Sequence, residues 1–172
     1  MTTPFDPTDD QGFPYEADEF PEIGPDSLAP IPTRALARII DTFLLAIVAL
    51  AAVSILGTVS VDDEAVNVDA PGWLPLAVLA FSAAYEIILT TTRGQTLGKM
   101  AMGIRVAQRG QGTNPTPNQA IVRWIVPNIA GVIPIAEVAA IAVLVVYLSA
   151  AANALRQGVH DRAATTVVVR TR

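Results

Sequence analysis

Three long apolar stretches constrain this chain more than any other feature of its sequence. Residues 42–61 and 73–92 are each 20 residues long; the first carries no charge and the second carries one, Glu86. A helix needs about 20 apolar residues to cross the ~30 Å hydrocarbon core of a bilayer. The third stretch, residues 124–155, has 32 residues with Glu137 as its one charge. We therefore expect an all-α membrane protein, a small bundle of three or four transmembrane segments.

The third stretch is too long for one upright span and short for two. As a continuous helix it would extend about 48 Å, and Pro127 and Pro134 interrupt it. We favour a broken pair, with a short tilted helix over 119–132 and a fuller span over 136–155, separated by a break near Pro134. A single tilted helix is the alternative.

The charges that flank the expected spans predict an orientation. The loop between the first two spans, at about 39–61 and 73–92, carries four acids and no basic residue, whereas residues 93–123 carry five basic residues. Because basic loops stay on the cytoplasmic side, the N-terminus is expected in the cytoplasm. Residues 156–172 carry four arginines, so the C-terminus is expected there too, which requires an even number of crossings.

The N-terminal segment differs from the rest of the chain. Residues 1–33 hold eight acids, seven prolines and no Lys or Arg. Such a segment has too little apolar surface to offset the entropy of ordering, so we expect a disordered cytoplasmic tail ahead of one transmembrane domain, residues 34–172. Its acidic start does not resemble a secretory signal. Two roles remain open for the tail: docking to a basic partner, or acting as a solvated spacer.

Composition argues against most catalytic chemistry. The chain has no cysteine and a single histidine, which removes disulfides, thiolate catalysis and the usual zinc sites. The run Gly94–Lys99 has three residues between its glycines and Met100 after the lysine, so it does not have the spacing of a nucleotide-binding P-loop. We expect no enzymatic activity, no cofactor, no metal and no nucleic-acid partner.

Two polar segments have a strand pattern rather than a helical one. Residues 103–110 alternate apolar and polar side chains, and residues 165–170 are rich in β-branched residues. Such segments favour strands. We expect them to pair as a short cytoplasmic β-hairpin.

Three charged residues share one face at the start of the first span. Arg34, Arg38 and Asp41 fall on the same side of a helix because seven residues complete nearly two turns. An unpaired carboxylate at membrane level is costly, so Asp41 is expected to pair with Arg34 or Arg38. The group is either an ion or proton site or a helix anchor whose arginines reach the lipid headgroups.

Glu86 and Glu137 add two acids within the apolar stretches. Acids at this depth often line a proton or cation pathway. The alternative for Glu86 is an internal pair with a basic residue, which would lock the bundle together.

Three motifs occur in order along the chain. TRALARIIDTFL has an Arg, an Ala and an Asp at positions 34, 37 and 41; RGQTLGKMAMGIRV follows the second span; and RQGVHDRAATTVVV contains His-Asp-Arg. Together they resemble the RDD (Arg-Asp-Asp) family. The resemblance implies Arg34, Asp41 and Asp161 as signature residues, and a loop motif made of Gly94, Gln95, Thr96, Gly98 and Lys99.

The resemblance implies a multi-pass bacterial plasma-membrane protein from a family for which transport has been suggested. We favour an accessory or scaffold subunit that joins a larger membrane complex or self-associates, because three acids do not trace a continuous charged pathway. The alternative is an ion-transporting or proton-coupled protein that acts as an oligomer. Asp161 is expected to reach the arginines at the start of the first helix and tie the C-terminal strand to the bundle.

Overall fold

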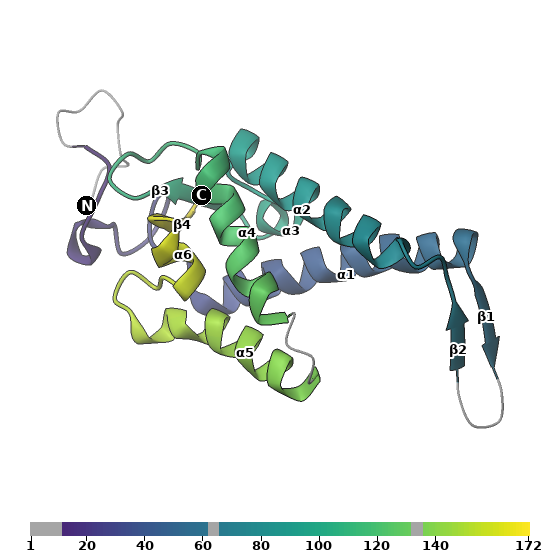
Figure 1. Ribbon diagram of the computed structural model, residues 1–172. Coiled ribbons are helices and arrows are strands. Elements are labelled where there is room, and N and C mark those ends of the chain that lie inside the picture. Colours follow the sequence, from purple (N-terminus) through teal and green to yellow (C-terminus); the bar gives the residue numbers. More distant parts are fainter. Residues whose placement is uncertain (1–11, 62–65, 132–135) are drawn as a thin grey trace.

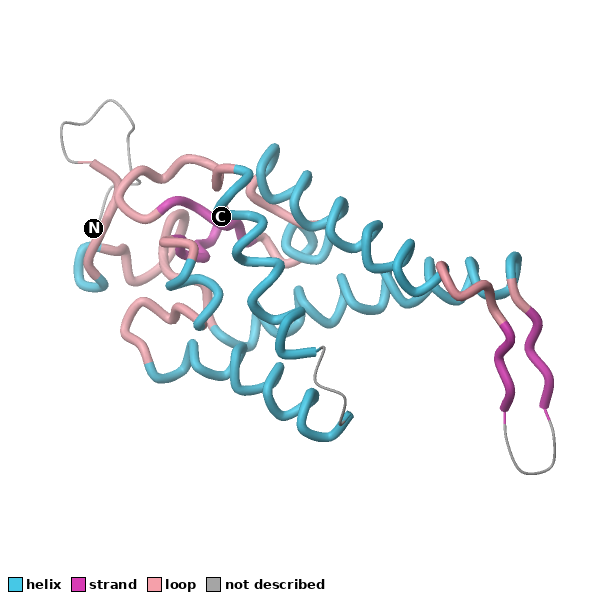
Figure 2. Tube along the Cα trace, viewed as in Figure 1, coloured by secondary structure: helices cyan, strands magenta, loops and turns pink. Residues whose placement is uncertain are grey.

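The computed structural model describes residues 12–61, 66–131 and 136–172. Two long helices, α1 and α2, run side by side along the molecule, with one small sheet at their far end and a second at the other (Figures 1 and 2). In chain order the elements are η1 (Ala17–Glu19), α1 (Ile31–Leu56), β1 (Thr58–Val61), β2 (Val66–Asp69), α2 (Leu74–Arg93), α3 (Leu97–Ala101), β3 (Ile104–Gln108), α4 (Pro117–Gly131), α5 (Ala136–Leu148), η2 (Ser149–Ala152), α6 (Val159–Ala163) and β4 (Thr166–Arg170).

The helix α1 begins earlier and ends earlier than the predicted span over 39–61. Pro30 precedes it and Pro32 lies in its first turn, where the fixed φ angle of proline suits a helix start and no amide hydrogen is needed. At the other end the amide of Gly57 donates to the carbonyl oxygen of Val53 at 2.8 Å. The helix stops there because the next four residues, three of them β-branched, pair with β2.

The helix α2 agrees closely with the predicted second span. It ends at Gly94, whose φ of +67° is a left-handed conformation that glycine adopts without strain. The amide of Gly94 donates to the carbonyl oxygen of Thr90 at 3.0 Å. Both α1 and α2 are long and apolar enough to cross a membrane.

The third apolar stretch contains two helices in the described part of the chain. Helix α4 includes Pro127. Helix α5 packs against α4 and ends at Leu148, and the 3-10 helix η2 begins at Ser149. The predicted full span to residue 155 is therefore too long. The predicted break near Pro134 lies outside the described residues.

The strands β3 and β4 form the antiparallel pair that their sequences predict, with Val106 opposite Val168. Both faces of this small sheet are covered. Ala107, Val167 and Val169 belong to one buried cluster, and Val106 and Val168 belong to another that includes Ala37 of α1. Burial on both faces accounts for the continuous run of valines, since neither face meets water.

The segment 12–30, which we call the strap, packs on this sheet, in contrast to the disorder expected for residues 1–33; residues 1–11 of that expected tail lie outside the described residues. Its two phenylalanines, Phe13 and Phe20, are buried in one cluster with Leu155 and the outer face of the sheet. Beside β4, the amide of Ala29 donates to the carbonyl oxygen of Val168 at 2.9 Å, and Leu28 bridges to Val169. Aromatic anchors and a shared sheet edge thus supply the order that the composition does not predict.

Two acids of the strap pair with arginines in or just after β3. Asp26 pairs with Arg105 at 2.8 Å, and the more exposed Glu16 pairs with Arg109 at 3.2 Å. The guanidinium of Arg109 lies 3.8 Å from the ring centroid of Tyr15. These two acids of the strap therefore pair with arginines of the same chain, and docking of the tail to another protein stays a prediction.

Candidate functional site

Asp41 is a buried carboxylate held by three donors that carry no charge. It is 1% exposed and accepts hydrogen bonds from the Tyr85 hydroxyl at 2.7 Å, the Thr96 hydroxyl at 2.5 Å and the Gly98 amide at 2.8 Å. These donors come from α2, from the residue before α3, and from α3 itself. The expected ion pair of Asp41 with Arg34 or Arg38 is wrong, because both arginines pair with other acids.

The loop motif explains how α3 comes so close to Asp41. A Cβ atom on Gly98 would lie 2.2 Å from the carbonyl oxygen of Ala37 and 2.9 Å from Cγ of Asp41. Only a residue without a side chain fits that contact, and Ala37 is the small residue opposite it. Gln95 steadies the loop by donating to the carbonyl oxygen of Ile104 at 2.9 Å.

The second acid, Glu86, is paired. Arg38 donates to Glu86 Oε2 at 2.8 Å, which joins α1 to α2. The same guanidinium lies 5.4 Å from the ring centroid of Tyr147 on α5. The contact agrees with the interpretation in which Glu86 pairs with a basic residue and ties the helices together.

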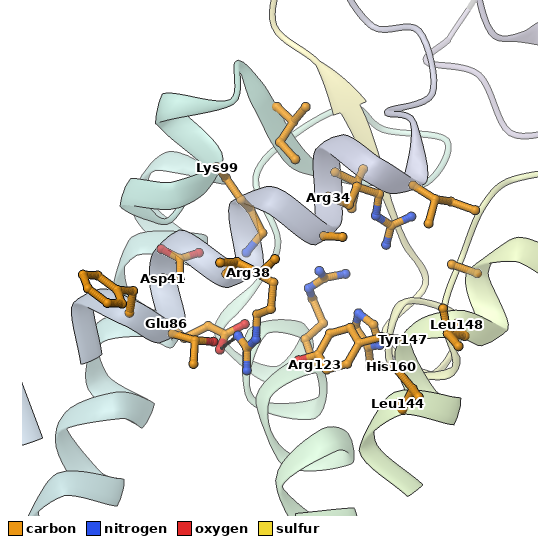
Figure 3. Close-up of a pocket in the computed structure, with 18 of the residues that line it drawn as sticks. Arg34, Arg38, Asp41, Glu86, Lys99, Arg123, Leu144, Tyr147, Leu148 and His160 are labelled. Carbon is orange, nitrogen blue, oxygen red and sulfur yellow. Dashed lines mark hydrogen bonds and ion pairs between the residues drawn. The ribbon is translucent and has the colours of Figure 1, made fainter. Parts of the chain in front are cut away.

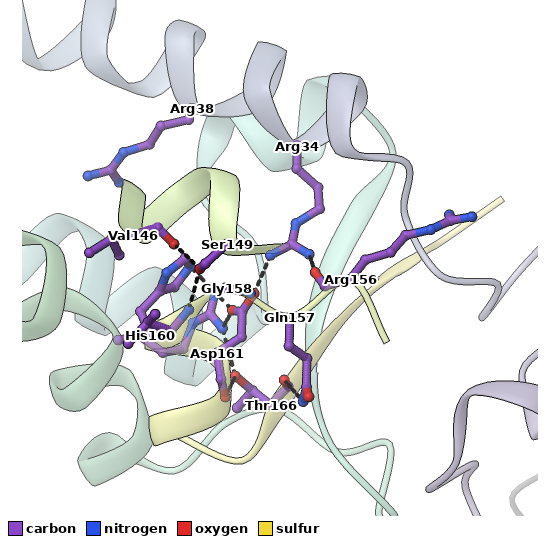
Figure 4. A network of polar contacts seen from close by, with 12 residues as sticks. Arg34, Arg38, Val146, Ser149, Arg156, Gln157, Gly158, His160, Asp161 and Thr166 are labelled. Carbon is purple, nitrogen blue, oxygen red and sulfur yellow. Dashed lines mark hydrogen bonds and ion pairs between the residues drawn. The ribbon is translucent and has the colours of Figure 1, made fainter. Parts of the chain in front are cut away.

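The third acid, Asp161, is fully buried, and Figure 4 shows it among its partners. It has no exposed surface. It forms ion pairs with Arg34 of α1 and Arg123 of α4, and the amide of Gly158 donates to it at 3.2 Å. Burial alone would raise the pKa of Asp161, but the guanidinium groups of Arg123 and Arg34 outweigh burial and hold that pKa far below its usual range.

This arrangement joins three parts of the chain at one carboxylate. Arg34 also donates to the carbonyl oxygen of Arg156, and Arg123 donates to the Thr166 hydroxyl at 2.6 Å. The expectation that Asp161 reaches the arginines at the start of α1 agrees with its contact to Arg34. Arg123 was not singled out from the sequence.

His160 lies beside Asp161 and is also buried. Its Nε2 is 3.4 Å from Asp161 Oδ1, and its ring lies 5.1 Å from that of Tyr147. Burial, with help from Arg123 and Arg34, lowers the pKa of His160 to about 4, although Asp161 opposes the shift. The imidazole is therefore neutral at pH 7.

Unlike Arg34, Arg38 and Arg123, Lys99 forms no ion pair with a carboxylate in the described part of the chain. Its ammonium donates to the Thr96 hydroxyl at 3.3 Å. Burial lowers the pKa of Lys99, and the carboxylates of Glu86 and Asp41 partly offset this effect.

We call these side chains together the charged cluster: the acids Asp41, Glu86 and Asp161 and the cations Arg34, Arg38, Lys99 and Arg123. Except for Asp161, all of them line a cavity of about 490 Å³ between α1 and α5. Figure 3 shows their side chains converging on it from α1, α2, α3 and α4. The remaining lining is largely apolar, with Ile39 and Phe43 from α1 and Leu144 and Leu148 from α5.

The His, Asp and Glu side chains are the candidate metal ligands in the described part of the chain. Among residues 12–61, 66–131 and 136–172, no three His, Asp or Glu side chains gather closely enough to hold a metal ion. Glu137 is part of α5, but its side chain lies outside what the structure describes.

Two helices of membrane-spanning length, with buried ion pairs at one end and a small antiparallel sheet beside them, define a largely helical membrane protein. The chain belongs to the RDD family, whose family model matches residues 28–165. That match covers the first two motifs and all but the last four residues of the third, and it ends just before β4. No curated protein and no solved structure matches the chain.

Proposed function

We propose that this protein is a small multi-pass membrane subunit that associates with other membrane-embedded helices, and that its charged cluster is a structural lock. The observation that carries the proposal is the exposure of its long helices. In the most apolar 18-residue windows of α1 and α2, 6% and 11% of residues are buried. Most of both helices is thus free to contact lipid or another chain.

Small side chains on α1 support contact with a partner. Ala46, Ala49 and Ala52 lie along the part of α1 that follows the charged cluster. Helices in lipid associate by close packing rather than by hydrophobic driving force, and small residues let their backbones approach. A second copy of this chain and a different membrane protein are both compatible partners.

The pairing of the acids supports a lock rather than an open ion pathway. Glu86 is tied to Arg38, Asp161 to two arginines, and Asp41 to three uncharged donors. An acid that binds and releases ions repeatedly needs an unoccupied side, whereas these carboxylates already contact protein donors. Breaking such buried pairs is costly.

For topology, we propose that α4 and α5 enter and leave the bilayer from the side that holds the β3–β4 sheet. At ~1.5 Å per residue the two helices extend only about 22 Å and 20 Å, less than the ~30 Å of hydrocarbon. β3 precedes α4, and α6 and β4 follow α5, so the pair starts and finishes near that sheet (Figure 1). The basic residues around the sheet favour the cytoplasmic face of the plasma membrane for both termini.

Labelling tests this topology. Cysteine replaces Thr171, and a membrane-impermeant maleimide is applied to intact cells and then to lysed cells. Labelling only after lysis supports a cytoplasmic C-terminus. Labelling of intact cells would contradict the proposal and would favour an odd number of crossings.

Photocrosslinking tests the association itself. A photoreactive amino acid replaces Leu50 or Ile55, which are exposed on α1, and the membranes are irradiated. We expect protein-sized adducts from these positions and none from Ile23, an exposed strap residue that serves as the control. Adducts of lipid size alone from α1 would refute the association.

The cavity favours a second candidate function, ion or proton-coupled transport by an oligomer. Glu86, Asp41 and Lys99 all line it. Flux through proteoliposomes that contain wild type or Glu86→Gln tests this function. A flux that disappears in the variant would support transport, and an absent or unchanged flux would count against it.

A further inference from the structure

Basic side chains outnumber acids by one in the charged cluster. The basic residues are Arg34, Arg38, Lys99 and Arg123, and the acids are Asp41, Glu86 and Asp161. Burial lowers the pKa of Lys99, and an anion beside it would favour its charged form. An excess of buried charge of one sign is costly unless an opposite charge approaches it. The cavity therefore favours an anionic occupant.

Lys99 is the cation with donors to spare. Arg38 is engaged by Glu86, and Arg34 and Arg123 are engaged by Asp161. The ammonium of Lys99 has three N–H donors, and its described hydrogen bond is the long one to Thr96 at 3.3 Å. Its side chain lines the cavity and points into it (Figure 3). An oxyanion in the cavity would find its donors there.

The apolar walls of the cavity indicate that the anion carries a hydrocarbon chain. Ile39 and Phe43 on α1, and Leu144 and Leu148 on α5, line the cavity and are also 53% to 68% exposed on the surface. These helix faces are too apolar for water, so in a membrane they face acyl chains. The cavity is thus continuous with lipid-facing surface, and a ligand that fits it combines a charged group with hydrocarbon.

The depth of the cluster fits the level of lipid phosphates. Its α1 members lie between positions 34 and 41, and no charged residue follows them in α1. The cluster is therefore at the polar end of the span, where headgroups meet hydrocarbon. Basic pockets between membrane helices at that level bind anionic headgroups, and a volume of about 490 Å³ lies within the range of small-ligand sites.

We propose that this cavity is a binding site for an anionic phospholipid, with the headgroup phosphate against Lys99 and an acyl chain in the groove between α1 and α5. The site requires that the helices lie in a membrane but does not depend on association with another chain. The outcomes of the lipid-binding experiment and of the photocrosslinking experiment are therefore independent of each other.

Native mass spectrometry of the full chain tests the site. The protein in mild nonionic detergent is titrated with phosphatidylglycerol or with phosphatidylcholine, which has the same phosphate but no net charge. We expect wild type to retain one phosphatidylglycerol with about tenfold preference, or ~1.4 kcal/mol. Lys99→Met should remove the preference, and Lys99→Arg should keep most of it. The control Arg93→Gln removes an exposed charge outside the cavity and should keep it fully.

A second pair of variants leaves the charged cluster intact. Leu144→Trp fills the cavity wall and should weaken phosphatidylglycerol retention, whereas Val145→Trp, on the neighbouring exposed residue that does not line the cavity, should not. Equal retention of both lipids by wild type would overturn the proposal. So would equal losses in Lys99→Met and Arg93→Gln, or in both tryptophan variants, or inorganic phosphate competing as well as phosphatidylglycerol.

Discussion

The amide of Gly98 donates to Asp41 Oδ1 at 2.8 Å, so that a glycine of α3 and a carboxylate of α1, 57 positions apart, are in direct contact. The contact holds α3 against α1 and brings Lys99, the next residue, to the cavity. Two of the recognised sequence motifs therefore act as one structural unit.

Gly98→Ala tests this contact. The added methyl would overlap the carbonyl oxygen of Ala37, so the variant should lose about 3 kcal/mol of unfolding free energy through overpacking. Thermal unfolding in detergent measures the loss. Gly72→Ala is the control, because a methyl there meets no atom within 4 Å, and its midpoint should stay near that of wild type. Similar midpoints for both variants would contradict the close packing of α3 on α1.

Asp161→Asn tests the buried ion pairs. The change leaves Arg34 and Arg123 buried without their counter-charge, so we expect a loss of about 3 to 5 kcal/mol. Glu16→Gln is the matched control: it breaks the pair with Arg109, in which Glu16 is 62% exposed. Such exposed pairs contribute less than about 1 kcal/mol. Equal unfolding midpoints for the two variants would refute the central role of Asp161.

His160 makes stability depend on pH. Because burial lowers the pKa of His160 from 6.5 to about 4 in the folded protein, the unfolded chain takes up a proton at a higher pH than the folded chain does. Stability should thus fall as pH falls from 6.5 towards 4, by up to about 3 kcal/mol. Unfolding midpoints measured across this range should drop in wild type.

The variant His160→Gln should flatten that dependence. Asp161 does not mask the effect, because its depressed pKa makes its own contribution vanish only below pH 3.8. The two groups therefore act in different pH windows. A wild-type profile that is flat between pH 6.5 and 4 would show that His160 is protonated in the folded protein.

Phe20→Ala tests the strap. Phe20 is buried and lies edge-on to Phe13, with ring centroids 5.7 Å apart. Its removal should cost about 3 kcal/mol and raise cleavage by a Glu-specific protease at Glu16 by on the order of a hundredfold. The control Ile23→Ala changes a side chain that is 77% exposed and should leave cleavage slow. Rapid cleavage of wild type would contradict a packed strap.

Hydrophobic length and β-branched pattern predicted the two long helices and the β3–β4 pair, because both signals are local. The end of α1 was missed because residues 58–61 carry no charge and so continue the uncharged stretch of the helix. Two features distinguish these four residues from the helix: Gly57 precedes them, and they pair with β2. The acidic sequence of the loop does not indicate that β2 is a strand. The strap was missed for a similar reason: Phe13 and Phe20 find their partners at the opposite end of the chain.

Most residues of the candidate site and the contact of Asp161 with Arg34 were predictable, but the partners of Asp41 were not. Charge alone placed Asp41 with Arg34 or Arg38, yet its three donors, Tyr85, Thr96 and Gly98, carry no charge and so give no electrostatic signal. Arg123 had a signal that was not used. It directly precedes the third apolar stretch, where a basic residue needs a partner as much as an acid does.

The strap has a consequence for biosynthesis. Residues 12–30 are translated before the membrane helices, but the strand they pack on, β4, is translated after them. Contacts between such distant segments form slowly because a long loop has to close. The side chains of Phe13 and Phe20 therefore stay exposed while the membrane helices are synthesised. Chaperones that bind exposed aromatic residues would have the longest time to bind the strap during this interval. In a chain truncated before Val167, the side chains of Phe13 and Phe20 would stay exposed.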